Sequence, residues 1–240
     1  MMKLVRNSIG FGLIALAMTA PAWSQTVDVT AQVEINGQSN HASAKSAAAG
    51  DVVIWLTPTK RNVAAVAVKS SQGYTLVQKN KMFTPHLLVV PTGSSIDFPN
   101  LDPFFHNVFS LFNGKRFDLG LYEAHSHRAV EFDRDGISYI FCNIHPEMGA
   151  VVITLSTPYY GVSKADGAVV IHNVPAGNYQ LNVWAENASN DTLNALGRSI
   201  DIGPQNTQLG VLYVKTTRDL MKQHKNKFGE EYPPTAKDPY

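Results

Sequence analysis

The run CNIHPEM at residues 142–148 constrains this sequence more than any other feature, because it contains the only cysteine among 240 residues. A further histidine, His106, lies upstream in the run FFHNV. Together the two segments offer a thiolate, two imidazoles and a thioether, the donor set of a type 1 copper site with a weak axial Met. Zinc fits less well, since its structural sites use Cys and His without Met. We therefore predict one copper ion bound by His106, Cys142, His145 and Met148.

The N-terminus indicates export. Lys3 and Arg6 give a positive start, and residues 9–20 form an uncharged apolar run. This run of about a dozen residues is shorter than the roughly 20 that a membrane-spanning helix needs. Small residues at positions 22 and 24 then suit a signal peptidase. We predict a signal peptide over residues 1–24, a periplasmic mature protein and no transmembrane segment.

Export also bears on the cysteine. A chain with one thiol cannot form an internal disulfide, and in an oxidising compartment that thiol is open to oxidation. Taken alone, Cys142 is equally well interpreted as a buried structural residue. Its neighbours His145 and Met148 favour a metal ligand instead.

The composition favours an all-β fold. The chain is rich in Val, Thr, Ser, Gly and Pro, and its sequence lacks long stretches of helical periodicity. The formal net charge is +1, with acidic and basic residues interspersed, so no basic field indicates a nucleic acid partner. The length is sufficient for two small domains or one large one.

Two segments around the cysteine are predicted to be strands. Residues 139–142 alternate between two faces, which places Ile140 and Cys142 on the same side. Residues 149–155 (GAVVITL) form a near-continuous apolar run, typical of a strand buried within a sandwich. The loop 143–148 would join the two strands at one end of the domain, where His106 would also arrive.

Residues 82–155 resemble the cupredoxins, the family of amicyanin and plastocyanin. The resemblance lies in FTPHLLVVPTG at 83–93, IDFPN at 96–100, Asp102 and the Cys-to-Met loop, whose spacing is similar to that of amicyanin. It implies a Greek-key β-sandwich, single-electron transfer, and the four metal ligands named above. The whole chain also resembles exported proteins of the methylamine-utilisation-like type. One departure is Ile144, which stands where amicyanin has Pro.

A second β-domain is predicted to be split around the first. The run GAVVIHNVPAGNYQLNVW at 167–184 alternates around a Pro-Ala-Gly turn and resembles the carboxypeptidase-regulatory-like (transthyretin-like) sandwich. We predict that residues 25–71 and 158–216 form this sandwich, with the copper domain at 72–157 inserted in it or packed beside it. Residues 217–240 are polar and contain Pro, which predicts a mobile C-terminal tail.

Residues next to the ligands are expected to tune the site. Asn107 is a candidate to tie the two ligand loops together by side-chain hydrogen bonds, although a turn-forming Asn is an equal alternative. Ile144 has a backbone N–H, which proline lacks, and the turn after Cys142 should aim it at the sulfur. Pro146 follows the second histidine and should shape the loop around it.

An apolar collar is predicted where the edge of His145 meets solvent. Such a patch would be the docking surface for a redox partner, and ordinary packing of loop aromatics is the alternative. Its predicted members are Phe104, Phe105, Pro146 and Met148.

The remaining histidines and motifs add little chemistry. His125 and His127 form one H-x-H pair, which leaves a weak second metal site open. His86 is interpreted as a structural histidine. The sequence contains no H-E-x-x-H, G-x-S-x-G or phosphate-cradling glycine motif, and the predicted ligand set leaves no open position for a substrate. We do not expect an enzyme.

Two functions from different classes therefore remain. The favoured one is electron transfer between periplasmic redox proteins, such as a cytochrome or an amine dehydrogenase. The alternative is a copper carrier, or a surface-recognition protein whose copper is structural. The complete Cys-His-His-Met set favours the first, and the appended sandwich favours the second.

Overall fold

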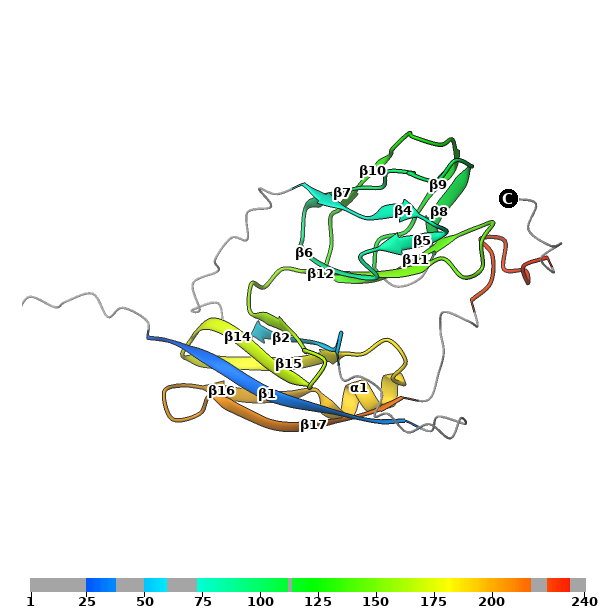
Figure 1. The fold of residues 1–240 in the computed structure, drawn as a ribbon. Coiled ribbons are helices and arrows are strands. Elements are labelled where there is room, and N and C mark those ends of the chain that lie inside the picture. The colour runs from blue at the N-terminus through cyan, green and yellow to red at the C-terminus, as the bar shows by residue number, and fades with distance from the viewer. Residues whose placement is uncertain (1–24, 38–49, 60–72, 112–113, 217–223, 234–240) are drawn as a thin grey trace, which may run out of the picture.

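The computed structural model describes residues 25–37, 50–59, 73–111, 114–216 and 224–233. These residues form strands joined by turns, with one short helix, α1 at Asn190–Leu196. The predicted all-β class is thereby confirmed. The predicted signal peptide at residues 1–24 lies outside the described residues, as does most of the stretch between the first two strands. Figure 1 shows two stacked β-units.

The unit drawn uppermost in Figure 1 contains strands β3 to β12. A five-stranded sheet of order β6-β12-β11-β8-β9 faces a three-stranded sheet of order β10-β7-β3, and β4 and β5 form a separate pair. Strand β12 pairs antiparallel with β11 and parallel with β6. The strand bounds are β3 Tyr74–Thr75, β4 Val77–Lys79, β5 Met82–Thr84, β6 Leu87–Pro91, β7 Ser94–Asp97, β8 His106–Ser110, β9 Phe117–Tyr122, β10 Ala129–Phe132, β11 Gly136–Cys142 and β12 Gly149–Leu155.

The core of this upper unit contains two of the predicted ligands. Cys142 and Met148 are fully buried in one apolar cluster with residues from both sheets, among them Phe98, Phe132 and Ile140. Burial of these large side chains removes apolar surface from water, which is the main favourable term in folding. The predicted ligand positions are therefore set by a packed core.

The lower unit is built from the strands that flank β3 to β12 in the sequence. Its two sheets have the orders β14-β1-β17 and β13-β2-β15-β16. Their inner faces meet in a second apolar cluster that includes Val33, Ile54, Leu181 and Leu212. The bounds are β1 Thr26–Gly37, β2 Val53–Pro58, β13 Tyr160–Val162, β14 Ala168–Pro175, β15 Gly177–Trp184, β16 Arg198–Ile202 and β17 Gln208–Thr216.

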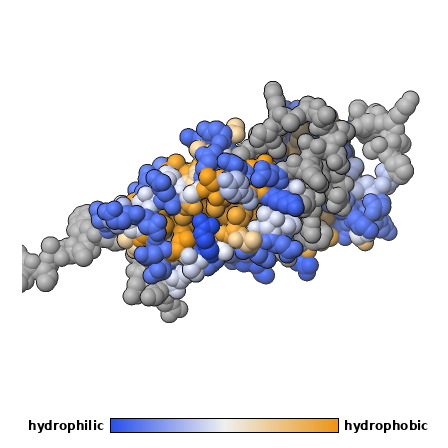
Figure 2. Space-filling view, turned by 90° about the horizontal axis from the view of Figure 1, so that it is seen from below, coloured by the Kyte–Doolittle hydropathy of each residue, from blue (hydrophilic) through white to orange (hydrophobic). Residues whose placement is uncertain are grey.

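The outer surface of the lower unit mixes polar and apolar side chains. Viewed from below, it shows apolar areas interrupted by polar ones (Figure 2). Exposed apolar residues on its strands β14 and β17 are Val170, Val211 and Tyr213. Buried and more exposed residues alternate along the first half of β14 and along most of β15, as the sequence predicts, and the buried ones in these stretches belong to the core of the sandwich.

The two units share a third apolar cluster. Strand β12 turns Ala150 and Val152 toward the upper core, whereas Val151, Ile153 and Leu155 pack against Val53 and Trp184 of the lower unit. The indole N–H of Trp184 also donates to the hydroxyl of Tyr139 at 3.3 Å. The apolar run 149–155 is thus explained by burial on both faces, one of them against the second unit.

Part of the predicted tail is in contact with the upper unit. Residues 224–233, drawn in red in Figure 1, lie beside the end of β11. The ring of His224 stacks on Phe141, with centroids 3.9 Å apart and an interplanar angle of 8°. These contacts argue against a mobile tail over residues 224–233.

Candidate metal centre

The first predicted ligand begins a fully buried strand. His106 is the first residue of β8, and all five residues of this strand are buried. Tyr122 of β9 is its cross-strand partner. The side chain of His106 has no exposure to solvent, so the orientation of its ring is set by packing.

The other ligands lie in and beside the loop that follows β11. Cys142 is the last residue of β11, and Met148 immediately precedes β12. The N–H of Cys142 donates to the carbonyl of Met148 at 3.3 Å, and the N–H of Met148 donates to the carbonyl of His145 at 3.1 Å. The N–H of Asn143 donates to the carbonyl of Asn107 at 2.9 Å, so the loop is also held to the β8 ligand strand.

Three of the four predicted donors converge on one point. The Sγ atom of Cys142 lies 3.6 Å from Nδ1 of His106 and 3.6 Å from Nδ1 of His145. The two Nδ1 atoms are 3.2 Å apart. These are the His and Cys residues of a metal-donor group in the described part of the chain. The structure thus brings together residues that are far apart in sequence.

This geometry fits a single metal ion. Metal–nitrogen distances of about 2.0 Å and metal–sulfur distances of about 2.3 Å place such donors 3–4 Å apart around one centre. One thiolate and two imidazoles match the trigonal ligands of a type 1 copper site, which a weak axial Met completes. Met148, the fourth predicted ligand, is fully buried in the same core cluster as Cys142.

A buried carboxylate holds the first histidine from behind. Nε2 of His106 lies 2.9 Å from Oδ2 of Asp102, and the side chain of Asp102 is only 4% exposed. Asp102 also accepts hydrogen bonds from the N–H groups of Asn80 at 2.6 Å and Lys81 at 3.0 Å. A carboxylate that accepts a hydrogen bond from one ring N–H leaves the other ring nitrogen free for a metal.

The sequence contains Asp102 within the cupredoxin-like run, and its pattern there predicts no role for this carboxylate. The available signal was its position four residues before His106. The side-chain contact itself depends on the path of the chain through residues 103–105.

The pKa shifts agree with this arrangement. Burial raises the pKa of Asp102, but hydrogen bonds from Lys81, His106 and Asn80 outweigh it and lower the pKa below the ordinary value. Burial lowers the pKa of His106, against the opposing effect of Asp102. The imidazole is therefore neutral near pH 7, as a metal ligand must be.

The thiol of Cys142 is also shaped by its surroundings. Burial raises its pKa, and backbone hydrogen bonds from Asn107, Ile144 and His145 oppose that effect. An N–H directed at sulfur stabilises the thiolate that binds a metal. The N–H of Ile144 is one of three backbone groups that oppose the effect of burial on this pKa.

Asn107 does not tie the two ligand segments through its side chain, as the sequence predicts. Its backbone carbonyl joins them, because it accepts from the N–H of Asn143 at 2.9 Å. The side chain of Asn107 instead donates from Nδ2 to Asp118 at 2.7 Å.

The ring of Phe104 lies against both histidines, with centroids 5.3 Å from His106 and 5.5 Å from His145.

The predicted collar is only partly exposed. Phe105 is 50% exposed, and Phe104 and Pro146 are half-buried. Met148 is fully buried and does not belong to the surface, because its side chain packs into the core beneath the loop. Ile144 is 45% exposed and adds an apolar side chain that the collar prediction had omitted.

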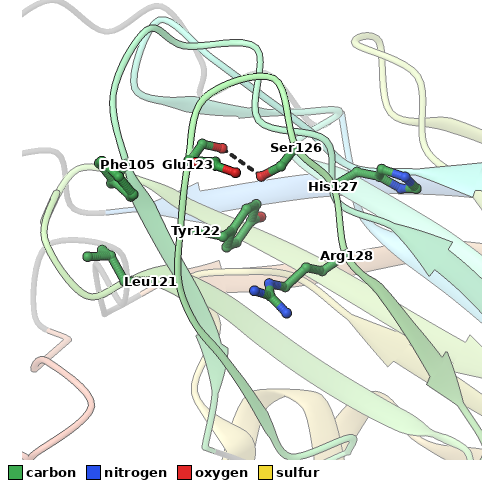
Figure 3. Close-up of a pocket in the computed structure, with 7 residues that line it drawn as sticks. All are labelled: Phe105, Leu121, Tyr122, Glu123, Ser126, His127 and Arg128. Carbon is green, nitrogen blue, oxygen red and sulfur yellow. Dashed lines mark hydrogen bonds between the residues drawn. The ribbon is translucent and has the colours of Figure 1, made fainter.

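A pocket of about 400 Å³ lies beside this surface (Figure 3). Phe105 and Leu121 lie at one end of it, and His127 points away from them at the other. His127 pairs with Asp97 at 2.7 Å, and His125 adopts a positive φ of 61° in the preceding turn. Among the described residues, neither histidine belongs to a group of three metal donors.

Comparison with solved structures finds partial likenesses. A copper-containing nitrite reductase from Thermus scotoductus aligns over 35% of this chain at 20% identity, with a TM-score of 0.34. This chain covers only 22% of that reductase, about a fifth of its length. A purple cupredoxin from Nitrosopumilus maritimus aligns over 34% of this chain and 99% of its own, at 19% identity and a TM-score of 0.31. A reduced amicyanin variant aligns over 38% and 90%, at 17% identity and a TM-score of 0.33.

No family model matches the sequence, and no curated protein matches it. In the described part of the chain, no helix has the length and apolar character to cross a membrane. The hypothesis of a copper centre therefore rests on the donor geometry. A thiol and two imidazoles meet within 3.6 Å, where strand β8 begins and strand β11 ends.

Proposed function

We propose that this chain is a periplasmic type 1 copper protein that carries single electrons between redox partners. His106, Cys142, His145 and Met148 would hold the copper ion. The observation that carries the proposal is the convergence of one Sγ and two Nδ1 atoms within 3.2–3.6 Å.

The protein contributes a rigid setting for the metal. Bound copper would supply the one-electron chemistry, cycling between Cu(I) and Cu(II). His106 and Cys142 come from neighbouring strands and are fully buried, and Asp102 fixes the ring of His106. Donors that cannot move keep the structural change between the two oxidation states small, which favours fast electron transfer.

Electron exchange would take place at the exposed end of this site. His145 is half-buried, its ring lies against Phe104, and the preceding residue Ile144 is exposed. A periplasmic cytochrome or dehydrogenase could approach its imidazole edge there. Four protein ligands leave no position for a substrate, so we propose a carrier of electrons and not an enzyme.

The principal test is the colour of the copper-loaded protein. Thiolate-to-Cu(II) charge transfer should give strong absorption near about 600 nm, and Cys142→Ser should abolish it. A matched control is Asp97→Asn, which removes a carboxylate from an exposed Asp–His pair in the same domain and should leave the colour intact. A colourless protein with one Cu(II) per chain would contradict the type 1 assignment.

A second candidate is a copper carrier, or a surface-recognition protein with a structural copper site. The lower sandwich favours this second function, since a soluble electron shuttle needs no second domain. The lower sandwich also exposes Val211 and Tyr213 on strand β17. Protein-film voltammetry followed by metal analysis separates the two. Electron transfer requires reversible reduction with copper retained, whereas a carrier should lose copper when it is reduced.

Periplasmic location is proposed from residues 1–24 alone. Expression of the full chain followed by mass spectrometry of the mature protein tests it. A mature N-terminus near residue 25 is expected, and an unprocessed N-terminus in the cytoplasmic fraction would contradict export.

A further inference from the structure

Residues 224–233 form a compact turn with its own hydrogen bonds. The side-chain oxygen of Asn226 accepts from the N–H groups of Phe228 at 2.9 Å and Glu230 at 3.0 Å. Its backbone carbonyl accepts from the N–H of Gly229 at 3.0 Å. Gly229 has a φ of +80°, a conformation that glycine adopts without strain. The segment therefore has a defined shape.

This turn contacts the strand that ends in the predicted cysteine ligand. The hydroxyl of Tyr232 donates to the backbone carbonyl of Cys142 at 2.9 Å. Nε2 of His224 lies 3.1 Å from the same hydroxyl, while its ring stacks on Phe141. The aromatic stack thus places Tyr232 at the peptide bond that leads from Cys142 into the metal loop.

The same segment is bonded to the loop and to the neighbouring strands. The N–H of Lys227 donates to Oδ1 of Asn143 at 2.9 Å. Its ammonium group lies 2.8 Å from Asp118 of β9, which in turn accepts from the side chain of Asn107. Asn107 and Asn143 are the residues that follow the two ligands His106 and Cys142. The segment therefore spans both ligand-bearing parts of the site.

We propose that residues 224–233 are a strap that holds the metal loop in place, with Tyr232 as its main positioning residue. The bond to the Cys142 carbonyl fixes the plane of the peptide between Cys142 and Asn143. That peptide leads into the turn that carries His145, whose carbonyl accepts from the N–H of Met148 at 3.1 Å.

The effect on metal retention rests on the proposed copper function, whereas the strap itself can be tested without metal. Tyr232→Phe removes only the hydroxyl. His224→Ala removes the stack on Phe141 and leaves the tyrosine in place. Tyr213→Phe is the matched control, because Tyr213 is 57% exposed on β17 of the other unit.

The metal-free arm measures hydrogen exchange by mass spectrometry in the full chain. Loss of one hydrogen bond should speed deuterium uptake in the 141–148 peptide by roughly three- to tenfold in Tyr232→Phe. His224→Ala should act in the same direction, and Tyr213→Phe should match the wild type. Wild-type uptake in both strap variants would overturn the strap.

The copper arm measures release of the metal to a chelator, together with the visible spectrum. Release should quicken by roughly three- to tenfold in Tyr232→Phe, while the thermal unfolding of the metal-free protein stays at the level of the Tyr213→Phe control. Faster exchange with unchanged release and spectrum would overturn the positioning role. If the wild type itself binds no copper, the proposed function fails and the exchange arm still decides the strap.

Discussion

The carboxylate of Asp102 and the imidazole of His106 form a buried pair, with Oδ2 and Nε2 2.9 Å apart. The two residues are four positions apart in sequence, and their side chains are only 0% (His106) and 4% (Asp102) exposed to solvent. Because Asp102 occupies Nε2, the Nδ1 atom faces Cys142 and His145. The carboxylate thereby selects the ring nitrogen that meets the metal.

Asp102→Asn should weaken copper binding by about 10- to 100-fold, the usual effect of losing a carboxylate that supports a histidine ligand. The potential should also rise, since a less basic imidazole stabilises Cu(II) less. Competitive chelator titrations of the oxidised protein and voltammetry measure the two effects. Asp97→Asn, which breaks the exposed pair with His127, is the control. Wild-type affinity and potential in Asp102→Asn would show that the pair does not tune the site.

Ile144→Pro should lower the reduction potential. The substitution removes a backbone N–H that acts on the Cys142 sulfur, and such a bond withdraws electron density and so stabilises Cu(I). A hydrogen bond of about 1–3 kcal/mol to a charged acceptor corresponds to some tens of millivolts up to roughly a hundred.

Voltammetry checks the shift, and the visible spectrum must show that the ligands are unmoved. Ile144→Val is the matched control because it keeps the N–H at the same exposed position. An unchanged or higher potential in a spectroscopically intact Ile144→Pro protein is incompatible with this bond.

The contact between the units should depend on pH through His86. Its hydrogen bond to Glu186, 2.9 Å long, raises the pKa of His86 above the ordinary value of about 6.5. Because the folded-state pKa is raised, this stabilisation is fully present below about pH 6.5 and is lost as pH rises through the folded-state value. The pair is partly exposed, so solvent screening limits its contribution to about 1 kcal/mol at most.

Thermal unfolding of wild type and Glu186→Gln, followed from pH 5.5 to 8.5, measures this dependence. The difference between the two proteins should shrink toward the alkaline end. A difference that stays constant across the range would exclude His86 as its source.

Val151→Ala should destabilise the protein by about 2 kcal/mol, from the lost transfer of two methyl groups and the cavity left behind. Val151 is fully buried in the cluster between the units. Val211→Ala, on the exposed face of β17, should cost less than about 0.5 kcal/mol. Denaturant unfolding measures both, and equal effects would contradict a tight interface.

Removal of residues 72–157 would expose Val53 and Trp184, which the shared cluster buries. We therefore expect the lower sandwich that remains to be less stable than the full chain.

The loop that carries three predicted ligands could be predicted from the sequence, because those ligands are close together in the chain. Cys142, His145 and Met148 are three residues apart, and the strand pattern on either side fixes the direction of the loop. His106 could be added because the donor chemistry requires a second imidazole and the upstream run resembles that of cupredoxins. The all-β class followed from the composition and the lack of helical periodicity, and the strands β14 and β15 followed from alternation, a period that the backbone imposes residue by residue.

Other features depended on contacts between distant segments. The run at 149–155 indicated burial, but only the tertiary structure shows that Val151 and Ile153 face the second sandwich. The bond from Tyr232 to Cys142 joins positions ninety residues apart, from a polar segment with no periodicity to reveal it. Sequence by itself determined which side chains can bind a metal and which way their strands face, because those properties belong to single residues and short repeats. Tertiary structure decided what lies behind and around the ligands, because hydrogen bonds and packing between remote segments form only when the whole chain has folded.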